Sequence, residues 1–277
     1  MKDVRMSKCN DCSTCSVVTV GNRERLGLQT GKTDFVVALA GNPNTGKSTL
    51  FNALTGLRQH TGNWPGKTIA RAEGMVDYNG NRYKLVDLPG TYSLLSDSQD
   101  EEVARDFILF GRPDVTIVVL DATQLERNLN LALQILEVSD RVLFCLNLMD
   151  EAQSRGISIN VRGLARDLGA VVVPTVARTK EGIPALLKQM ESIAHGETTS
   201  DSTQIGSNIP GGTEIVDKLT HTLRNTFPGL QQAHWVALRL LTGDERIRTA
   251  VESGEIGKLD LDHAALLHDG SNHQEAE

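Results

Sequence analysis

The stretch Gly41-Asn42-Pro43-Asn44-Thr45-Gly46-Lys47-Ser48 decides the fold of this chain. Two glycines five positions apart, followed by a lysine and a hydroxyl residue, match the pattern of a phosphate-binding loop. Glycine permits backbone angles that let successive N–H groups turn toward one phosphate. In such a loop the ammonium group of Lys47 faces the β- and γ-phosphates, and the hydroxyl of Ser48 binds Mg²⁺. The stretch therefore predicts a nucleotide site.

The residues on both sides of this loop agree with that interpretation. Residues 35–40 form a short apolar run, which is typical of a buried strand. Residues 48–55 favour a helix, and Gly56 is a signal for its C-terminal end. A strand, a glycine-rich loop and a helix in this order are the context that a genuine phosphate loop requires.

The composition narrows the class of protein. Of the 277 residues, 39% are hydrophobic and 23% are charged, as in an ordinary soluble protein. The formal net charge of −7 argues against nucleic acid as the main partner. The sequence contains no run of about eighteen apolar residues and no apolar secretory segment, so we expect a cytoplasmic protein.

Three of the four cysteines, Cys9, Cys12 and Cys15, lie in a polar segment that we assign to residues 1–33. Their spacing is that of metal ligands, and three thiolates could hold a metal or part of an iron–sulfur cluster if a fourth ligand came from elsewhere. The alternative is a mobile tail with reduced thiols. Cys145 lies in an apolar run and is expected to be a small core residue.

Two segments after the first helix are candidates for contact with the nucleotide. Residues 59–68 contain several turn-forming residues and no hydrophobic period, which predicts a loop. Thr68 has a hydroxyl and a carbonyl that could reach Mg²⁺ and the γ-phosphate, although a plain connecting loop is the alternative. Asn79-Gly80 between strand-like runs at residues 73–78 and 81–86 predicts a hairpin.

The hairpin leads into Asp87-Leu88-Pro89-Gly90. An Asp at the carboxyl end of a strand points into the ligand crevice of an α/β sheet, where Asp87 would hold a Mg²⁺-bound water. Gly90 can offer its N–H to the γ-phosphate and move when that phosphate leaves. The alternative is a helix-capping Asp and a turn glycine. Thr91 stands where signalling GTPases have a Gln that orients the attacking water, so we expect slow turnover unless another group helps.

Further apolar runs extend the sheet. Residues 115–121, 142–146 and 170–176 predict strands, of which the first is a central parallel strand. Residues 126–137 have apolar side chains at helical spacing, and residues 183–194 predict the helix that closes the domain.

The strand at residues 142–146 leads into Asn147-Leu148-Met149-Asp150. The carboxylate of Asp150 can accept hydrogen bonds from N1–H and N2–H₂ of guanine, a pattern that adenine lacks. Asn147 either steadies the loop or meets the base edge. Leu148 stands where a Lys commonly covers the base, so we expect modest guanine affinity. Ala177-Arg178-Thr179 stands where a backbone N–H usually reaches the guanine oxygen.

Helical patterns return in the last quarter of the chain. Residues 196–212 are rich in Gly, Ser and Thr and predict a linker or loop. Residues 235–241 are strong helix formers, and residues 244–252 favour a further helix. This part is either a regulatory module or an extension that only stabilises the first domain. The first helix has three apolar residues at four-residue spacing: Ile215, Leu219 and Leu223.

Together these features predict an α/β fold of the P-loop GTPase class, Ras-like or TrmE-Era in type, with a mostly parallel sheet. We assign this domain to residues 34–195. A small all-α domain over residues 196–265 and a disordered tail over residues 266–277 follow it.

Several motifs together resemble the ferrous iron transport protein B (FeoB) family. The resemblance covers roughly residues 34–257. Residues 235–241 look like the small helical domain of that family. The other motifs are the phosphate loop, residues 63–68 (Asn-Trp-Pro-Gly-Lys-Thr), residues 87–94 (Asp-Leu-Pro-Gly-Thr-Tyr-Ser-Leu) and residues 102–107 (Glu-Val-Ala-Arg-Asp-Phe).

The resemblance implies a G domain that hydrolyses GTP slowly and a helical domain that acts like a built-in inhibitor of GDP release. It also implies a membrane-spanning iron permease, of which no part is present. The chain would then be the soluble cytosolic part of a transporter at the bacterial inner membrane. Small cytosolic accessory proteins and a homo-oligomer are further expected partners.

The resemblance also implies that Asn44 binds K⁺ beside the phosphates, where the ion would replace an arginine finger. The plainer role for Asn44 is to brace the loop by hydrogen bonds. Two features depart from the family or lie outside it: Ala177-Arg178-Thr179 differs from the usual base-binding loop, and Cys9 to Cys15 precede the shared region.

Two other functions compete with this one. A soluble GTPase of ribosome or RNA assembly is disfavoured by the net charge of −7 and by the lack of a basic stripe in residues 196–277. The other competing function is metal sensing, in which the tail with Cys9 to Cys15 binds a metal and regulates the GTPase.

The candidate site residues are as follows. Catalysis is assigned to Asn44, Lys47, Thr68 and Gly90. Mg²⁺ is assigned to Ser48, Thr68 and Asp87, K⁺ to Asn44, and a further metal to Cys9, Cys12 and Cys15. Contacts with GTP or GDP are assigned to Gly41, Asn42, Pro43, Asn44, Thr45, Gly46, Lys47, Ser48, Thr49, Gly66, Lys67, Thr68, Asp87, Leu88, Pro89, Gly90, Asn147, Leu148, Met149, Asp150, Ala177, Arg178 and Thr179.

Overall fold

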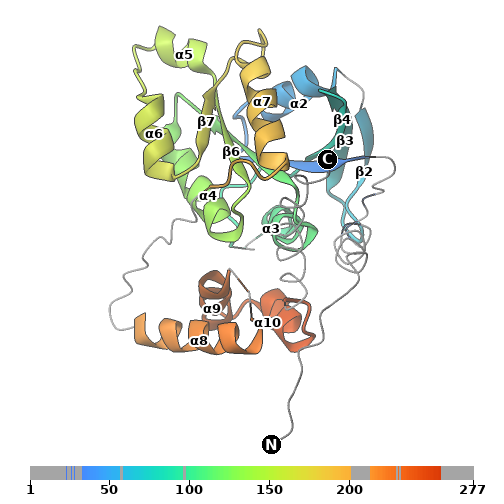
Figure 1. Ribbon diagram of the computed structural model, residues 1–277, viewed down its shortest axis with the longest axis vertical. Coiled ribbons are helices and arrows are strands. Elements are labelled where there is room, and N and C mark those ends of the chain that lie inside the picture. The colour runs from blue at the N-terminus through green and yellow to red at the C-terminus, as the bar shows by residue number, and fades with distance from the viewer. Residues whose placement is uncertain are drawn as a thin grey trace, which may run out of the picture. The chain divides into compact units, whose positions relative to one another are not determined.

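The computed structural model divides into two compact units, residues 25–207 and residues 1–24 together with 208–277 (Figure 1). Cys9, Cys12 and Cys15 lie outside the residues that the structure describes. Those residues are 23, 26, 28, 33–56, 59–95, 98–200, 213–228, 230 and 232–256.

A seven-stranded sheet in the order β2-β3-β4-β1-β5-β6-β7 forms the centre of the first unit, within its described part. Five of its neighbouring strands run parallel, which confirms the predicted sheet. These five are β4 (Asn81–Asp87), β1 (Phe35–Gly41), β5 (Val115–Asp121), β6 (Val142–Asn147) and β7 (Val171–Pro174). Because parallel strands end at the same edge, the loops that follow them gather there.

An antiparallel pair of strands extends one side of the sheet. β2 (Gln59–Asn63) pairs with β3 (Ala70–Tyr78), which pairs in turn with β4. The predicted hairpin between β3 and β4 is present, and Asn79 (φ 48°) and Gly80 (φ 84°) both adopt the left-handed conformation that a two-residue hairpin turn requires. The prediction of a loop over residues 59–68 was wrong for its first half, because β3 offers an edge to pair with.

Helices cover both faces of the sheet (Figure 1). α2 (Lys47–Thr55) and α7 (Ile183–Ala194) pack Phe51 and Leu186 against Val37 and Leu39 of β1 in one apolar core. α3 (Gln99–Gly111) and α4 (Leu125–Val138) lie on the opposite face, and α5 (Met149–Ser154) and α6 (Val161–Leu168) lie between β6 and β7 in the chain.

The boundaries of these elements follow local sequence signals closely. α2 ends at Gly56, which adopts the left-handed conformation (φ 60°), and α7 has the predicted bounds. Cys145 on β6 is fully buried, and burial raises the pKa of its thiol to about 12, so it is an inert core residue as expected. β7 is shorter than the predicted strand over residues 170–176, because the chain turns after Pro174.

The second unit consists, in its described part, of α8 (Thr213–Thr226), α9 (Ala233–Leu241) and α10 (Glu245–Glu252). Trp235 of α9 and Ile247 of α10 are buried, as is Val216 of α8. The predicted apolar stripe of α8 was partly wrong, because Ile215 is 58% exposed and Val216 takes its place beside the buried Leu223.

Candidate functional site

The phosphate loop connects β1 to α2 and has the backbone that its glycines permit. Gly46 has a φ of 83°, and a Cβ there would lie 2.4 Å from Nδ2 of Asn147, so no other residue fits. A Cβ on Gly41 would lie 2.8 Å from the carbonyl oxygen of Val119 on β5. Asn44 has a left-handed φ of 66° and an exposed side chain. Side-chain size at both glycines is therefore limited by the neighbouring strands.

Polar side chains hold this loop from within. The hydroxyl of Thr45 donates to the carbonyl of Asn42 (3.0 Å), and Nδ2 of Asn42 donates to the carbonyl of Arg127 on α4 (3.2 Å). Asn42 and Thr45 are both buried. The loop is thus shaped by its own buried side chains before any ligand is considered.

Lys47 and Asp87 lie in contact, although they are forty positions apart in the chain. Nζ of Lys47 donates to Oδ1 of Asp87 at 2.5 Å, and 11% and 17% of the two side chains are exposed. Burial raises the pKa of Asp87, and the ammonium group of Lys47 opposes that rise. The structure therefore brings together the predicted phosphate-binding lysine and the predicted Mg²⁺-linked carboxylate.

The segment after Asp87 lies against the phosphate loop. A Cβ on Gly90 would meet the backbone nitrogen of Pro43 at 3.3 Å, and the N–H of Thr91 donates to the carbonyl of Gly41 at 3.3 Å. Thr91 is buried, so its side chain does not stand free at the place where a water-orienting Gln would be. The next residue, Tyr92, is 41% exposed.

The loop that carries Thr68 packs on α3 through its neighbours. Trp64 is buried and meets the ring of Phe107 edge-on, with 5.4 Å between the ring centroids. Lys67 forms an ion pair with Glu102 of α3. Thr68 itself is exposed. Thr68, the predicted Mg²⁺ ligand, therefore lies on a short exposed segment that the packing of Trp64 and the ion pair of Lys67 hold against α3.

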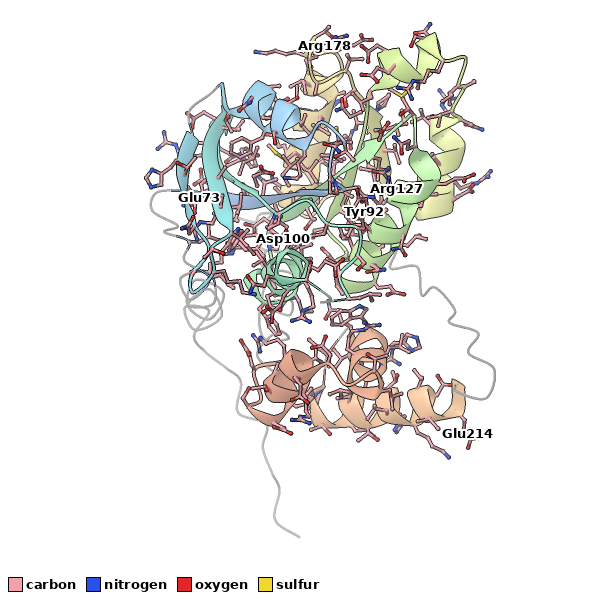
Figure 2. The ribbon with its side chains drawn as sticks, turned by 180° about the vertical axis from the view of Figure 1, so that it is seen from behind. Glu73, Tyr92, Asp100, Arg127, Arg178 and Glu214 are labelled. Carbon is pink, nitrogen blue, oxygen red and sulfur yellow. The ribbon has the colours of Figure 1, made fainter. Side chains whose placement is uncertain are left out.

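A buried ion cluster supports the same loop from the sheet. Glu73 of β3 forms ion pairs with Arg71 (2.9 Å) and with Lys84 of β4 (2.5 Å), and the guanidinium of Arg71 lies 5.4 Å from the ring centroid of Trp64. Figure 2 shows Glu73 on its strand. Sequence reasoning missed this cluster, because its three charges alternate along two strands and carry no motif.

The Asn147-x-x-Asp150 motif contains one buried residue and one partly exposed residue. Asn147 is 1% exposed; its Nδ2 donates to the carbonyl of Thr45 (2.9 Å), and its Oδ1 accepts from the N–H of Ala177 (3.0 Å). These hydrogen bonds are the ones expected of the first role left open for Asn147, which is to steady the loops. Leu148 adopts a left-handed φ of 63°, which turns the chain from β6 into α5.

Asp150 is the partly exposed residue of this motif. Its Oδ2 accepts from Nη2 of Arg178 at 2.8 Å, and 77% of the Arg178 side chain is exposed. Arg178 and its neighbours Ala177 and Thr179 follow β7, so the loop of the predicted guanine-oxygen donor does lie beside Asp150. A guanidinium group was not foreseen as the partner of Asp150.

Two cavities mark the same edge of the sheet. One, of about 560 Å³, is lined by Asp150, by the segment 156–159 and by residues 174–176 after β7. The other, of about 490 Å³, is lined by residues 122–127 after β5 and by Ile157. Both lie where ligands bind in open α/β sheets.

A family model described as "Ferrous iron transport protein B" matches residues 35–190, which is more than half of the chain. The chain belongs to the FeoB family. The FeoB resemblance of the motifs is thereby confirmed, and the alternative of a ribosome or RNA assembly GTPase is not favoured. Among the described residues, no cluster of three or more His, Cys, Asp or Glu side chains is placed to hold a metal.

Sequence and structure comparisons agree on this family. The chain is 40% identical over 212 residues to the Fe(2+) transporter FeoB of Salmonella typhimurium, which is 75% of this chain and 27% of the relative. It is similar to the cytosolic domain of L. pneumophila FeoB, with a TM-score of 0.72 at 35% identity over 84% of this chain and 93% of the other. It is also similar to a mutant S. thermophilus NFeoB bound to GDP, with a TM-score of 0.68 at 34% identity over 81% and 88%.

The coverage of the relatives also shows how much of a FeoB protein the chain represents. It spans about a quarter of the length of the curated FeoB relatives that it matches. In the part of the chain that the structure describes, no helix has the length and apolar character that crossing a bilayer would need.

Proposed function

We propose that this chain binds GTP and GDP and hydrolyses GTP slowly, as the regulatory switch of a bacterial ferrous iron transporter. The observation that carries the proposal is the contact of Lys47 with Asp87 beneath a loop whose two glycines admit no side chain. The match of the fold to an NFeoB that binds GDP supports the nucleotide. Thr91 in place of a water-orienting Gln supports slow turnover.

In this proposal, separate residues bind the phosphates and the base. Lys47 and the N–H groups of residues 41–46 hold the phosphate oxygens. Asp150 accepts hydrogen bonds from the guanine edge, and the N–H of a residue in the loop 177–179 reaches the guanine oxygen. Gly90, held beside Pro43, offers its N–H to the γ-phosphate. These assignments explain why four strand ends contribute to one site.

The donors available suit Mg²⁺, because a hydroxyl at Ser48 and a carboxylate at Asp87 are the hard oxygen ligands that this ion prefers. Lys47 contacts Asp87, and Ser48 follows Lys47 at the start of α2, so both oxygens belong to one corner of the site. Bound Mg²⁺ would neutralise phosphate charge, and Thr68 would complete its shell. Asn44, which is exposed on the loop, is the proposed ligand of K⁺.

The remaining proposals concern the whole transporter. The helical unit, residues 213–256 in its described part, would slow GDP release. The iron permease would be the covalently linked membrane partner, at the bacterial inner membrane, with this part on the cytoplasmic face. The domain limits proposed remain residues 34–195 and 196–265.

Two substitutions test the proposed function. Lys47→Ala is expected to abolish GTP binding measured by calorimetry, and Lys218→Ala, which removes an exposed lysine of α8, is the matched control. Asp150→Asn is expected to change the preferred base from guanine to xanthine. Nanomolar GTP affinity in Lys47→Ala, or unchanged guanine preference in Asp150→Asn, would refute the corresponding assignment.

A further inference from the structure

The segment that follows Gly90 is fastened to the exposed face of α4 by three contacts. The guanidinium of Arg127 lies over the ring of Tyr92, 4.5 Å from its centroid, and Figure 2 shows the two side chains next to each other. Nδ2 of Asn130 donates to the carbonyl of Tyr92 (3.2 Å), and Oε1 of Gln134 accepts from the N–H of Leu94 (2.6 Å). These contacts come from successive turns of one helix.

Arg127 also contacts the phosphate loop, through its backbone. Its backbone carbonyl accepts from Nδ2 of the buried Asn42, at 3.2 Å. One residue at the start of α4 therefore joins the loop predicted to hold the phosphates to the segment predicted to sense the γ-phosphate. This junction lies at the same strand edge as the proposed nucleotide site.

The segment has a second attachment on its other side. The hydroxyl of Ser93 donates to Oε1 of Glu101 on α3 (2.8 Å), while Gly90 rests against Pro43. Tyr92 is the exposed residue between these fixed points. Its position is therefore set mainly by Arg127 and Asn130, which makes the stack the adjustable part of the attachment.

We propose that Arg127 is a positioning residue for GTP hydrolysis, which holds Gly90 beside the phosphate loop by stacking on Tyr92. The proposal rests on the proposed GTPase function and adds a residue to it. Arg127 acts through Tyr92 and does not touch the reacting atoms. Releasing the stack lets residues 90–92 leave the phosphate loop for part of the time, so the fraction of molecules with Gly90 in place falls.

The expected effect follows from the exposure of the stack. A cation–π contact at an exposed site corresponds to about a two- to fivefold change in an equilibrium. Arg127→Ala and Tyr92→Ala should each lower kcat, by at most about that factor, because the fraction of molecules with Gly90 in place changes no more than the equilibrium constant does. KM for GTP should change little, because Lys47 and the backbone of the phosphate loop remain in place.

The experiment is a double-mutant cycle on the full chain, with GTP turnover measured under saturating GTP. The expected result is that the double variant is no slower than either single variant, and that Tyr92→Phe, which keeps a ring under the guanidinium, recovers most of the rate lost in Tyr92→Ala. Arg155→Ala, which removes an exposed arginine paired with Glu151, is the matched control and should turn over at the wild-type rate.

Three outcomes would overturn the proposal. They are a wild-type kcat in Arg127→Ala, a double variant slowed by the product of the two single effects, and a Tyr92→Phe variant as slow as Tyr92→Ala. The second would mean that Arg127 acts on the nucleotide directly. Failure of the proposed function itself is distinguishable, because the wild-type chain would then show no GTP turnover at all.

Discussion

Replacing Asn147 by Ala tests whether this residue braces the site or reads the base. The substitution removes a donor to the carbonyl of Thr45 at 2.9 Å and an acceptor for the N–H of Ala177 at 3.0 Å. Both bonds are buried, and each backbone group left without a partner costs about 1–3 kcal/mol. We therefore expect the unfolding free energy to fall by about 2–6 kcal/mol, a large part of the about 5–15 kcal/mol of a typical domain.

The assay is urea unfolding of the nucleotide-free chain, followed by circular dichroism. Asn130→Ala is the matched control, because Asn130 is exposed and water can replace its bond; its unfolding free energy should stay within about 0.5 kcal/mol of wild type. A value for Asn147→Ala equally close to wild type would refute the bracing argument.

The same variant separates the two roles through ligand binding. A lost brace loosens the phosphate loop and the loop 177–179 together, so affinity for GTP and for 7-deaza-GTP should fall by the same factor. If Asn147 acted by donating to N7 of guanine, the substitution would weaken GTP and leave 7-deaza-GTP, which lacks that acceptor, unaffected.

Three further predictions concern charged side chains and a bound ion at the site. Burial raises the folded-state pKa of Asp87 above 3.8, so the contribution of this residue to the unfolding free energy should decrease as pH rises from 3.8 through the raised value. Urea unfolding across this pH range should show a dependence of the unfolding free energy on pH that Asp87→Asn removes. A dependence that the substitution leaves unchanged would contradict the assignment. Arg178→Ala should free Asp150 and raise guanine affinity by about 1.5- to fivefold, which is the range for loss of an exposed ion pair. The control Arg155→Ala should leave guanine affinity unchanged. Weaker guanine binding in Arg178→Ala would mean that Arg178 supports the base instead. GTP turnover should be faster in KCl than in NaCl for the wild type and equal in the two salts for Asn44→Ala, and equal slow rates for the wild type would place the accelerator outside this chain.

Features fixed by neighbours in the chain were predictable from the sequence. Asn79-Gly80 needs no tertiary contact to specify its turn, because both residues tolerate the left-handed conformation found there. Gly56 ends α2 for the same reason. The phosphate loop belongs to this class too, since its glycines determine its backbone locally.

Features that depend on distant partners were not predictable. The segment 59–63 is polar and carries no alternation, yet it is a strand because β3 presents unpaired N–H and C=O groups to it. On α8, helical spacing alone could not say which of Ile215 and Val216 would be buried, because the two differ by one position and packing against α9 decides. In both cases tertiary packing overrode local preference.

The candidate site shows the same limit within one motif. The Asn-x-x-Asp pattern identified Asn147 and Asp150, but it left two roles open for Asn147. The hydrogen-bond partners of Asn147 are Thr45 and Ala177, which lie 102 and 30 positions away in the chain, so the motif alone could not identify them. Arg178 as the partner of Asp150 was also missed, because a single arginine in a loop carries no motif that would pair it with a residue 28 positions away.

The pair of Lys47 and Asp87 links the chemistry of the site to its stability. Both partners have proposed roles toward the nucleotide, the ammonium toward phosphate and the carboxylate toward a Mg²⁺-bound water. Burial raises the pKa of Asp87, and the ammonium group of Lys47 opposes that rise because it favours the charged form of the carboxylate. Nucleotide binding must then exchange this contact for contacts with phosphate and metal, so the measured affinity is the difference between the two. Asp87→Asn, which removes the charge attraction to Lys47, should therefore weaken Mg²⁺-dependent GTP binding more than GDP binding without Mg²⁺.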